Sequence, residues 1–439
     1  MVNRRRHRPT GPRRVTAPGP AHDSARRPQL RRDLGLLDAV GIGFGAIIGA
    51  VIFVVSGVAA GIAGPAFLLG LLIAGVAATA NALSSAQLAA EYPQSGGTYE
   101  YGYRVLTPSA GFAAGWMFLA SKAAAAGTVA LGLAGYLSGL IPGLPPRAVA
   151  VTAVVGFTGL NYFGVRRSSR VNLAIVAVSL GTLLLFVAFG IPAVRWQHLT
   201  PFAPSGWRGV LESAAILFFA YTGYARIATL GEEVRDPRTT IPRAVVITIG
   251  GAVLLYMAVA LVAVGTAGAE ALSATAAPLR AAAGQTAFVW LPVVVSAGGL
   301  TAMLGVILSQ LLGLSRMVFA MARRGDLPRS LEYVDAGRAV PGRAVLAVGA
   351  IAAVVAATGS LRGIAAAASF TILVYYGITN LAALRMPPET KRYSDAVPLV
   401  GLTSCVVLAV SLPPATIGAG LTILAAGVIA RWASRPQRS

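Results

Sequence analysis

The segment GIGFGAIIGAVIF, residues 41–53, decides how the rest of the chain is interpreted. It lies within an apolar stretch, 36–62, that can cross a bilayer, since about 20 apolar residues suffice. Four glycines, Gly41, Gly43, Gly45 and Gly49, crowd into it, and each costs roughly 1 kcal/mol relative to alanine inside a helix. In lipid, unwound backbone is tolerated only where it is buried in protein or lines a watery cavity. The segment therefore predicts either a broken helix, whose freed backbone groups hold charged ligand groups, or close helix packing through small residues.

The composition is that of an all-α polytopic membrane protein, with 56% hydrophobic and 12% charged residues in a chain of 439. The single cysteine, Cys405, excludes an internal disulfide and a cysteine metal cluster. The three histidines lie outside the apolar stretches, so no metal site is expected in the membrane. No histidine or aspartate pair could serve as nucleophile and base within the spans, so neither an enzyme nor a cofactor is expected.

The net charge of +21 suggests nucleic-acid binding until the arginines are located. Ten of them lie in residues 1–32, and most of the others lie in loops. Residues 1–33 are rich in Arg and Pro and have no apolar face to bury, which predicts a disordered basic cytoplasmic tail. No nucleic-acid partner is expected; membrane lipid is.

Twelve transmembrane helices are predicted. If the N-terminus is cytoplasmic, the inner segments hold 30 basic residues and the outer ones five, with Lys122 inside a span. This asymmetry follows the positive-inside rule and predicts a multi-pass plasma-membrane protein with both termini cytoplasmic. After the first span, the others are 66–89, 110–139, 147–164, 171–193, 208–231, 242–266, 290–321, 343–359, 364–385, 397–412 and 415–431.

The sixth span repeats the peculiarity of the first. It carries ILFFAYTGY, residues 216–224, which places Thr222 and Gly223 at mid-membrane before the polar run GEEVRDP, 231–237. Spans one and six correspond if the chain is two five-span repeats, 34–195 and 205–386, with 395–439 forming the last two spans and the C-terminus. An odd number of spans per repeat inverts the second copy. Paired broken spans in matching positions indicate the central site of a transporter.

Four motifs in order resemble those of the amino acid–polyamine–organocation permeases. They are GAIIGAVIFVVSGVA (45–59) followed by AGP (63–65), NALSSAQLAAEYPQSGGTY (81–99), FFAYTGY (218–224) with GEEVRDPRTTIP (231–242), and SRMVFAMARRGDLP (315–328). The resemblance runs from about residue 34 to the C-terminus. It implies the five-plus-five inverted-repeat fold shared with sodium-coupled neurotransmitter transporters, and alternating access around a small amino acid or amine.

The resemblance also implies a substrate site between the two breaks. In relatives the substrate carboxylate is held by backbone N–H groups that correspond to Gly49, Ala50 and Val51. The amine is held by carbonyls that correspond to Ile47, Phe219 and Thr222, and an aromatic corresponding to Phe219 caps the site. The site is thus expected to be lined by the backbone of 47–51 and 219–223, including Ala220 and Gly223, with Phe219 and Tyr221 as gating residues.

Three positions depart from the family pattern. Val51 stands where the family usually has glycine, and Ala225 where an acid is common in relatives. Ser179 replaces the span-five lysine of many proton-linked relatives. Lys122 introduces a charge into span three, where it costs about 3 kcal/mol. It indicates a role at the site or in coupling, unless it snorkels to an interface.

These features predict a secondary-active permease for a neutral or acidic amino acid, coupled to protons through Lys122 by symport or exchange. A buried lysine can take up and release a proton near neutral pH. The alternatives are a sodium-coupled carrier of the same fold, with Ser179 as a ligand, or an amine or polyamine transporter. A transporter-like membrane sensor is the alternative from another class. A channel is disfavoured because its pore rings usually arise from oligomeric symmetry.

Overall fold

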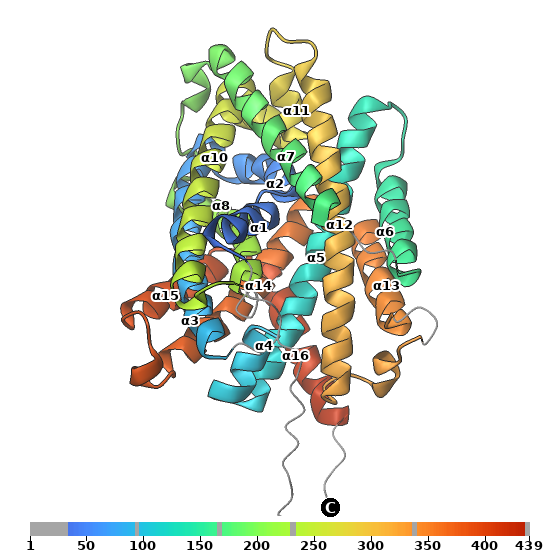
Figure 1. Cartoon of the computed structure of the whole chain (residues 1–439). Helices are drawn as coiled ribbons and strands as arrows, with labels where there is room; N and C mark the ends of the chain where they lie inside the picture. The colour runs from blue at the N-terminus through green and yellow to red at the C-terminus, as the bar shows by residue number, and fades with distance from the viewer. Residues whose placement is uncertain (1–33, 93–95, 165–168, 229–233, 336–339, 435–439) are drawn as a thin grey trace, which may run out of the picture.

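The computed structural model describes residues 34–92, 96–164, 169–228, 234–335 and 340–434. Within these ranges the chain is helical, and the only β-type contacts are two isolated bridges (Figure 1). The predicted all-helical class is therefore confirmed. The predicted tail 1–33 lies outside the described residues, as do Glu232 and Glu233 of the span-six exit motif.

The helices begin and end at local sequence signals. Pro108, Pro146, Pro237 and Pro414 each occupy the first position of a helix, where the missing N–H costs nothing. The helices are α1 (Leu36–Ile47), α2 (Ala50–Ala63), α3 (Phe67–Glu91), α4 (Thr98–Tyr101), α5 (Pro108–Leu140), α6 (Pro146–Tyr162), α7 (Ser169–Gly190), α8 (Gly206–Tyr221), α9 (Ala225–Ala228), α10 (Pro237–Ser273), α11 (Pro278–Ala283), α12 (Leu291–Arg323), α13 (Gly342–Thr358), α14 (Leu361–Leu384), α15 (Ala396–Val410) and α16 (Pro414–Ser434).

Seven helical segments in the described ranges are long and apolar enough to cross a membrane. One of them, Ala50–Glu91, contains both α2 and α3. Gly64 stands between these two helices with φ of 60°, and a Cβ there would press on Pro204, so the turn requires glycine. Three further apolar helices, α1, α13 and α15, are shorter. The segments are Ala50–Glu91, Pro108–Leu140, Val171–Ala193, Thr239–Ser273, Leu291–Arg323, Leu361–Leu384 and Pro414–Trp432.

The centre of the bundle is built around α5, which packs along α12 and α14, while α8 packs against α2 and α3. The outer surface is apolar: Leu254 is 74% exposed, Val354 61% and Ile429 65%. Exposed side chains of this kind on several helices fit a surface that faces lipid rather than water. The chain is an integral membrane protein.

Candidate functional site

The first candidate element is the gap between α1 and α2. Ile47 ends α1, and Ile48 and Gly49 leave the helical conformation, with ψ of 84° and −162°. Ile48 still donates its N–H to the Phe44 carbonyl at 2.7 Å. The first N–H groups of α2, from Ala50 and Val51, have no carbonyl partner in the helix, as at any helix start. The predicted break thus falls at Ile48–Gly49.

The second candidate element is the end of α8. Tyr221 is its last residue, and Thr222–Tyr224 form a single 3₁₀ turn before α9 begins at Ala225. The Thr222 hydroxyl donates to the Phe219 carbonyl at 2.9 Å. The turn tightens the backbone and leaves the last carbonyls of α8 free of full helical hydrogen bonding.

The two breaks touch. Gly223 lies against the end of α1 so closely that a Cβ on it would overlap the Ala46 carbonyl and stand 2.7 Å from the Ile47 nitrogen. Only glycine permits this approach. The start of α2 and the end of α8 are therefore held beside each other, and these are the N–H end of one helix and the carbonyl end of another.

All three carbonyls predicted to hold an amine already accept a hydrogen bond from the protein. Tyr256 donates to the Ile47 carbonyl at 2.7 Å, and Tyr376 donates to that of Thr222 at 3.5 Å. The Phe219 carbonyl accepts from Thr222. Each carbonyl oxygen keeps a second lone pair. No sequence pattern marks Tyr256 or Tyr376 as a partner of the breaks.

Lys122 lies beside Phe219. Its Nζ is 5.8 Å from the centre of the Phe219 ring and 5.6 Å from that of Phe118, within reach of a cation–π interaction. Phe219 is 3% exposed and packs with Val51 of α2 and with α5 and α14. In the described ranges no carboxylate pairs with Lys122. The structure therefore places the span-three amine next to the predicted cap.

Other predicted site residues point elsewhere. Tyr221 is fully buried and donates to the Leu71 carbonyl at 3.3 Å, so its hydroxyl is directed to α3. Ala220, beside it, is 3% exposed. Ser179 donates to the Ile175 carbonyl of its own helix at 2.8 Å and makes no hydrogen bond to Lys122. Among the described residues no cluster of three His, Cys, Asp or Glu could hold a metal ion.

An ion pair lies between α8 and α14. Arg362 donates to the Glu212 carboxylate at 2.8 Å. Glu212 is 9% exposed and stands two helical turns before Phe219 on α8, while Arg362 is at the start of α14. The pair joins the broken helix to the helix that carries Tyr376. Sequence reasoning did not single out either residue.

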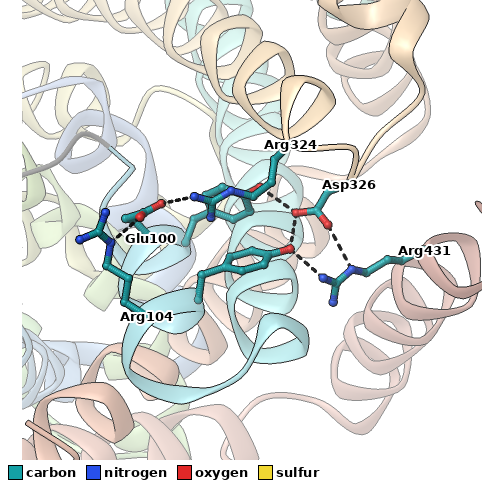
Figure 2. A network of polar contacts seen from close by, with 7 residues as sticks. Glu100, Arg104, Arg324, Asp326 and Arg431 are labelled. Atoms are coloured by element: carbon teal, nitrogen blue, oxygen red, sulfur yellow. Dashed lines mark hydrogen bonds and ion pairs between the residues drawn. The ribbon is translucent and has the colours of Figure 1, made fainter. Parts of the chain in front are cut away.

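A second polar network lies where α4 meets the ends of α12 and α16 (Figure 2). Glu100 accepts hydrogen bonds from Arg104 at 2.5 Å and Arg324 at 2.6 Å. Burial alone would raise the pKa of the Glu100 carboxyl, but the hydrogen bonds from Arg104 and Arg324 outweigh it and hold that pKa below its usual range. Glu100 is therefore kept ionised.

Asp326 forms the other half of this network, as Figure 2 shows. It accepts hydrogen bonds from Tyr99 at 2.7 Å, from Tyr103 at 2.5 Å and from Arg431 at 3.1 Å. Asp326 and Arg431 are both buried, so each charge depends on the other. Burial, followed by the hydrogen bond to Asp326, raises the pKa of both tyrosines, which stay protonated as donors.

An apolar helical bundle with two facing helix breaks is the architecture of a membrane transporter rather than of an enzyme. The amino acid permease family model matches residues 38–435, and the chain belongs to that family. It is 45% identical over 404 residues to an uncharacterised transporter of Mycobacterium tuberculosis, covering 92% of this chain and 91% of the relative. It is 28% identical to the branched-chain amino acid permease BcaP of Bacillus subtilis, and that match covers 91% of this chain and 92% of the relative. It is 30% identical to the methylthioribose transporter of the same organism, and that match covers 88% of this chain and 90% of the relative.

Proposed function

We propose that the protein moves a small amino acid across the plasma membrane by alternating access, with the two breaks as its substrate site. The observation that carries this is the contact of Gly223 with the end of α1, which sets the start of α2 beside the end of α8. A helix start carries partial positive charge and a helix end partial negative charge. The two charges of a zwitterionic amino acid match such a pair: the carboxylate would meet the N–H groups of 49–51, and the amine the carbonyls of Ile47, Phe219 and Thr222.

The proposed architecture is twelve spans with both termini cytoplasmic. Residues 34–195 and 205–386 would form two five-span repeats of opposite orientation, and 395–439 the last two spans. In this arrangement α1–α2 and α8–α9 are the first spans of their repeats, and both are interrupted. The excess of basic residues on one side supports the orientation.

The proposed substrates are neutral or acidic amino acids. Lys122 beside Phe219 adds positive charge near the site, and Ala225 supplies no acid to face a second amine. A cationic side chain 4 Å from the lysine would be repelled by about 4 kcal/mol at an effective dielectric constant near 20. The name of the branched-chain relative is in keeping with a neutral substrate.

The coupling ion is proposed to be a proton carried by Lys122. Ser179 is already bonded to its own helix, and no acidic cluster suited to a cation is found in the described ranges. A sodium-coupled carrier, with Ser179 turned toward the ion, is the alternative that the same experiments would reveal.

The deciding experiment is uptake into proteoliposomes together with a thermal-shift screen of twenty amino acids and common polyamines. We expect a neutral or acidic amino acid to stabilise the protein, to show saturable uptake and to drive counterflow. Displacement of labelled substrate by arginine or putrescine better than by alanine would contradict the substrate class. Binding without counterflow would indicate a sensor instead of a carrier.

A further inference from the structure

A cavity of about 610 Å³ lies within the bundle, and no residue of the two breaks lines it. It is bounded by α5, α12, α13, α14 and α16, with Trp116 and Ala124 of α5 as part of its floor. Its wall on the outside of the bundle is α13, which stands at the edge of the molecule beside α6 (Figure 1). Ile351 of α13 lines the cavity and is 55% exposed, so the cavity opens on the surface that faces lipid.

The residues that line the cavity leave almost no hydrogen-bonding group free for water. Thr358 and Thr371 donate their hydroxyl groups to carbonyls of their own helices, Val354 and Ala367. The Ser360 hydroxyl accepts the N–H of Gly363 as the cap of α14. A buried water needs two to four polar partners, so inside a bilayer this space suits hydrocarbon.

One end of the cavity carries positive charge. Leu327 and Leu331 line it, and Arg329 between them is exposed. Arg343 stands on α13 one turn before the lining residue Ala347, lies 4.7 Å above the Tyr333 ring and donates to the Ser330 carbonyl at 3.5 Å. Neither arginine pairs with a carboxylate in the part of the chain that the structure describes.

We propose that this cavity is a binding site for one acyl chain of an anionic phospholipid whose phosphate is held by Arg329 and Arg343. The chain fills an apolar space that water cannot satisfy, and the headgroup meets two arginines that form no ion pair with any described carboxylate. Arginine suits phosphate because its donors form a planar fork. A juxtamembrane Arg is also attracted electrostatically to anionic lipid headgroups.

The site lies one side-chain layer from the candidate gate. Ala124, Ile364 and Val355 line the cavity and also belong to the group that packs around Phe219. The consequence for gating rests on the proposed function. An occupied cavity supports the Phe219 ring from the cavity side, whereas an empty cavity leaves the ring free to tilt toward it. Binding itself does not depend on that function.

The test uses Trp116, whose indole N–H donates to the Ile423 carbonyl at 2.7 Å and fixes the ring in the cavity wall. A full-length protein with Trp116 as its sole tryptophan is made by replacing the other four with phenylalanine. It is reconstituted with anionic or zwitterionic phospholipids that are brominated along the acyl chains, and the quenching of its fluorescence is measured. We expect strong quenching that grows with the fraction of anionic lipid.

Two variants fill the cavity from different helices, Ala347→Phe and Ala367→Phe, and Leu346→Phe on the exposed side of α13 is the matched control. The filled variants should lose quenching while the control keeps it, and thermal unfolding identifies any variant that has not folded. Quenching that is equal in filled and control variants would show that bromine reaches Trp116 only from outside and would overturn the site.

Arg329→Gln with Arg343→Gln should abolish the preference for anionic lipid; an unchanged preference would overturn the headgroup assignment. Loss of quenching when the protein forms a dimer would overturn the lipid site and would show that a second copy of the protein covers the cavity. None of these readouts requires transport, so failure here is distinct from failure of the proposed function.

Discussion

A Cβ placed on Gly223 would overlap the Ala46 carbonyl oxygen, so the α-carbon of Gly223 packs directly against that carbonyl. This contact joins the interruption of α8 to the end of α1. Any movement that opens one break must therefore either carry the other break with it or separate this contact. Gly223 thus links the two interruptions mechanically, in addition to the packing of α8 against α2.

Gly223→Ala should abolish uptake and lower stability. The new methyl group would overlap the Ala46 carbonyl, and overpacking of this kind costs about 1–3 kcal/mol. The measurement is uptake in proteoliposomes together with the thermal unfolding temperature. Gly250→Ala on α10 is the matched control, because a Cβ there meets nothing within 4 Å. Normal uptake by Gly223→Ala would show that the contact is dispensable.

Substitutions at Gly49 should separate a size effect from a folding effect. A Cβ at this position would stand 3.2 Å from Cγ2 of Val306 on α12. Gly49→Ala should retain reduced uptake, and adding Val306→Ala should restore it. Gly49→Leu should abolish uptake while membrane insertion is normal, because its side chain would fill the space at the start of α2. Wild-type uptake by Gly49→Leu would argue against the substrate site.

Lys122 should be required for accumulation driven by a pH gradient. Lys122→Ala removes the amine beside Phe219, and Lys122→Arg keeps the charge but cannot release its proton. Both variants should lose pH-driven accumulation and keep counterflow, which needs no net ion movement. The assay compares imposed proton and sodium gradients. Uptake that follows sodium, or an unchanged response in Lys122→Ala, would assign coupling to another ion or residue.

Breaking the Glu212–Arg362 pair should favour opening between α8 and α14. A partly exposed pair contributes about 1 kcal/mol or less, so Glu212→Gln should raise the open population by up to about fivefold. Ser369→Cys, buried against the Ile216 carbonyl of α8, reports the opening through its rate of labelling by a thiol reagent. The sole native cysteine, Cys405, is buried and adds little background. Glu270→Gln, an exposed carboxyl without an ion pair in the described ranges, should leave the rate unchanged.

The contribution of Glu100 to stability should depend on pH. Its folded-state pKa is below the unfolded value of about 4.3, so its ion pairs stabilise the protein at pH values above that and stop doing so as pH falls through the folded pKa. Glu100→Gln should therefore destabilise by about 1–2 kcal/mol at pH 7, and the difference from wild type should vanish in acid. Glu91→Gln, an exposed carboxyl at the end of α3, is the control. A difference that persists unchanged in acid would show that packing, not charge, is responsible.

Local signals made the helical class and most helix ends predictable. Proline at a first turn and glycine in a turn act within a few residues, so they can be identified in isolation. The glycine-rich segment at 41–53 and the Thr222-Gly223 pair were visible for that reason, and the structure has helix ends at Ile47 and Tyr221. The resemblance to the permease family in the sequence likewise rests on four such local motifs.

Partners that lie far apart in the chain could not be predicted in the same way. Tyr256 reaches the Ile47 carbonyl across 209 residues, and Arg324 reaches Glu100 across 224. No periodicity connects such positions; only the packed bundle does. The same holds for Lys122, whose position within a span was evident but whose closeness to Phe219 depends on where the bundle places α5 relative to α8. The roles of the substrate and coupling residues stay predictions.

The pair formed by Asp326 and Arg431 sets an order for biogenesis. Asp326 follows α12, which ends at Arg323, whereas Arg431 lies in the last turn of α16, 105 residues further along the chain. Until the ribosome has added the 105 residues that separate the two, the buried carboxylate has no Arg431 guanidinium to neutralise it, and Tyr99 and Tyr103 are its donors. This end of the bundle can thus close only after α16 has been synthesised and packed in place. Removing the last turn of α16 would take away Arg431 and leave the Asp326 carboxylate without this ion pair.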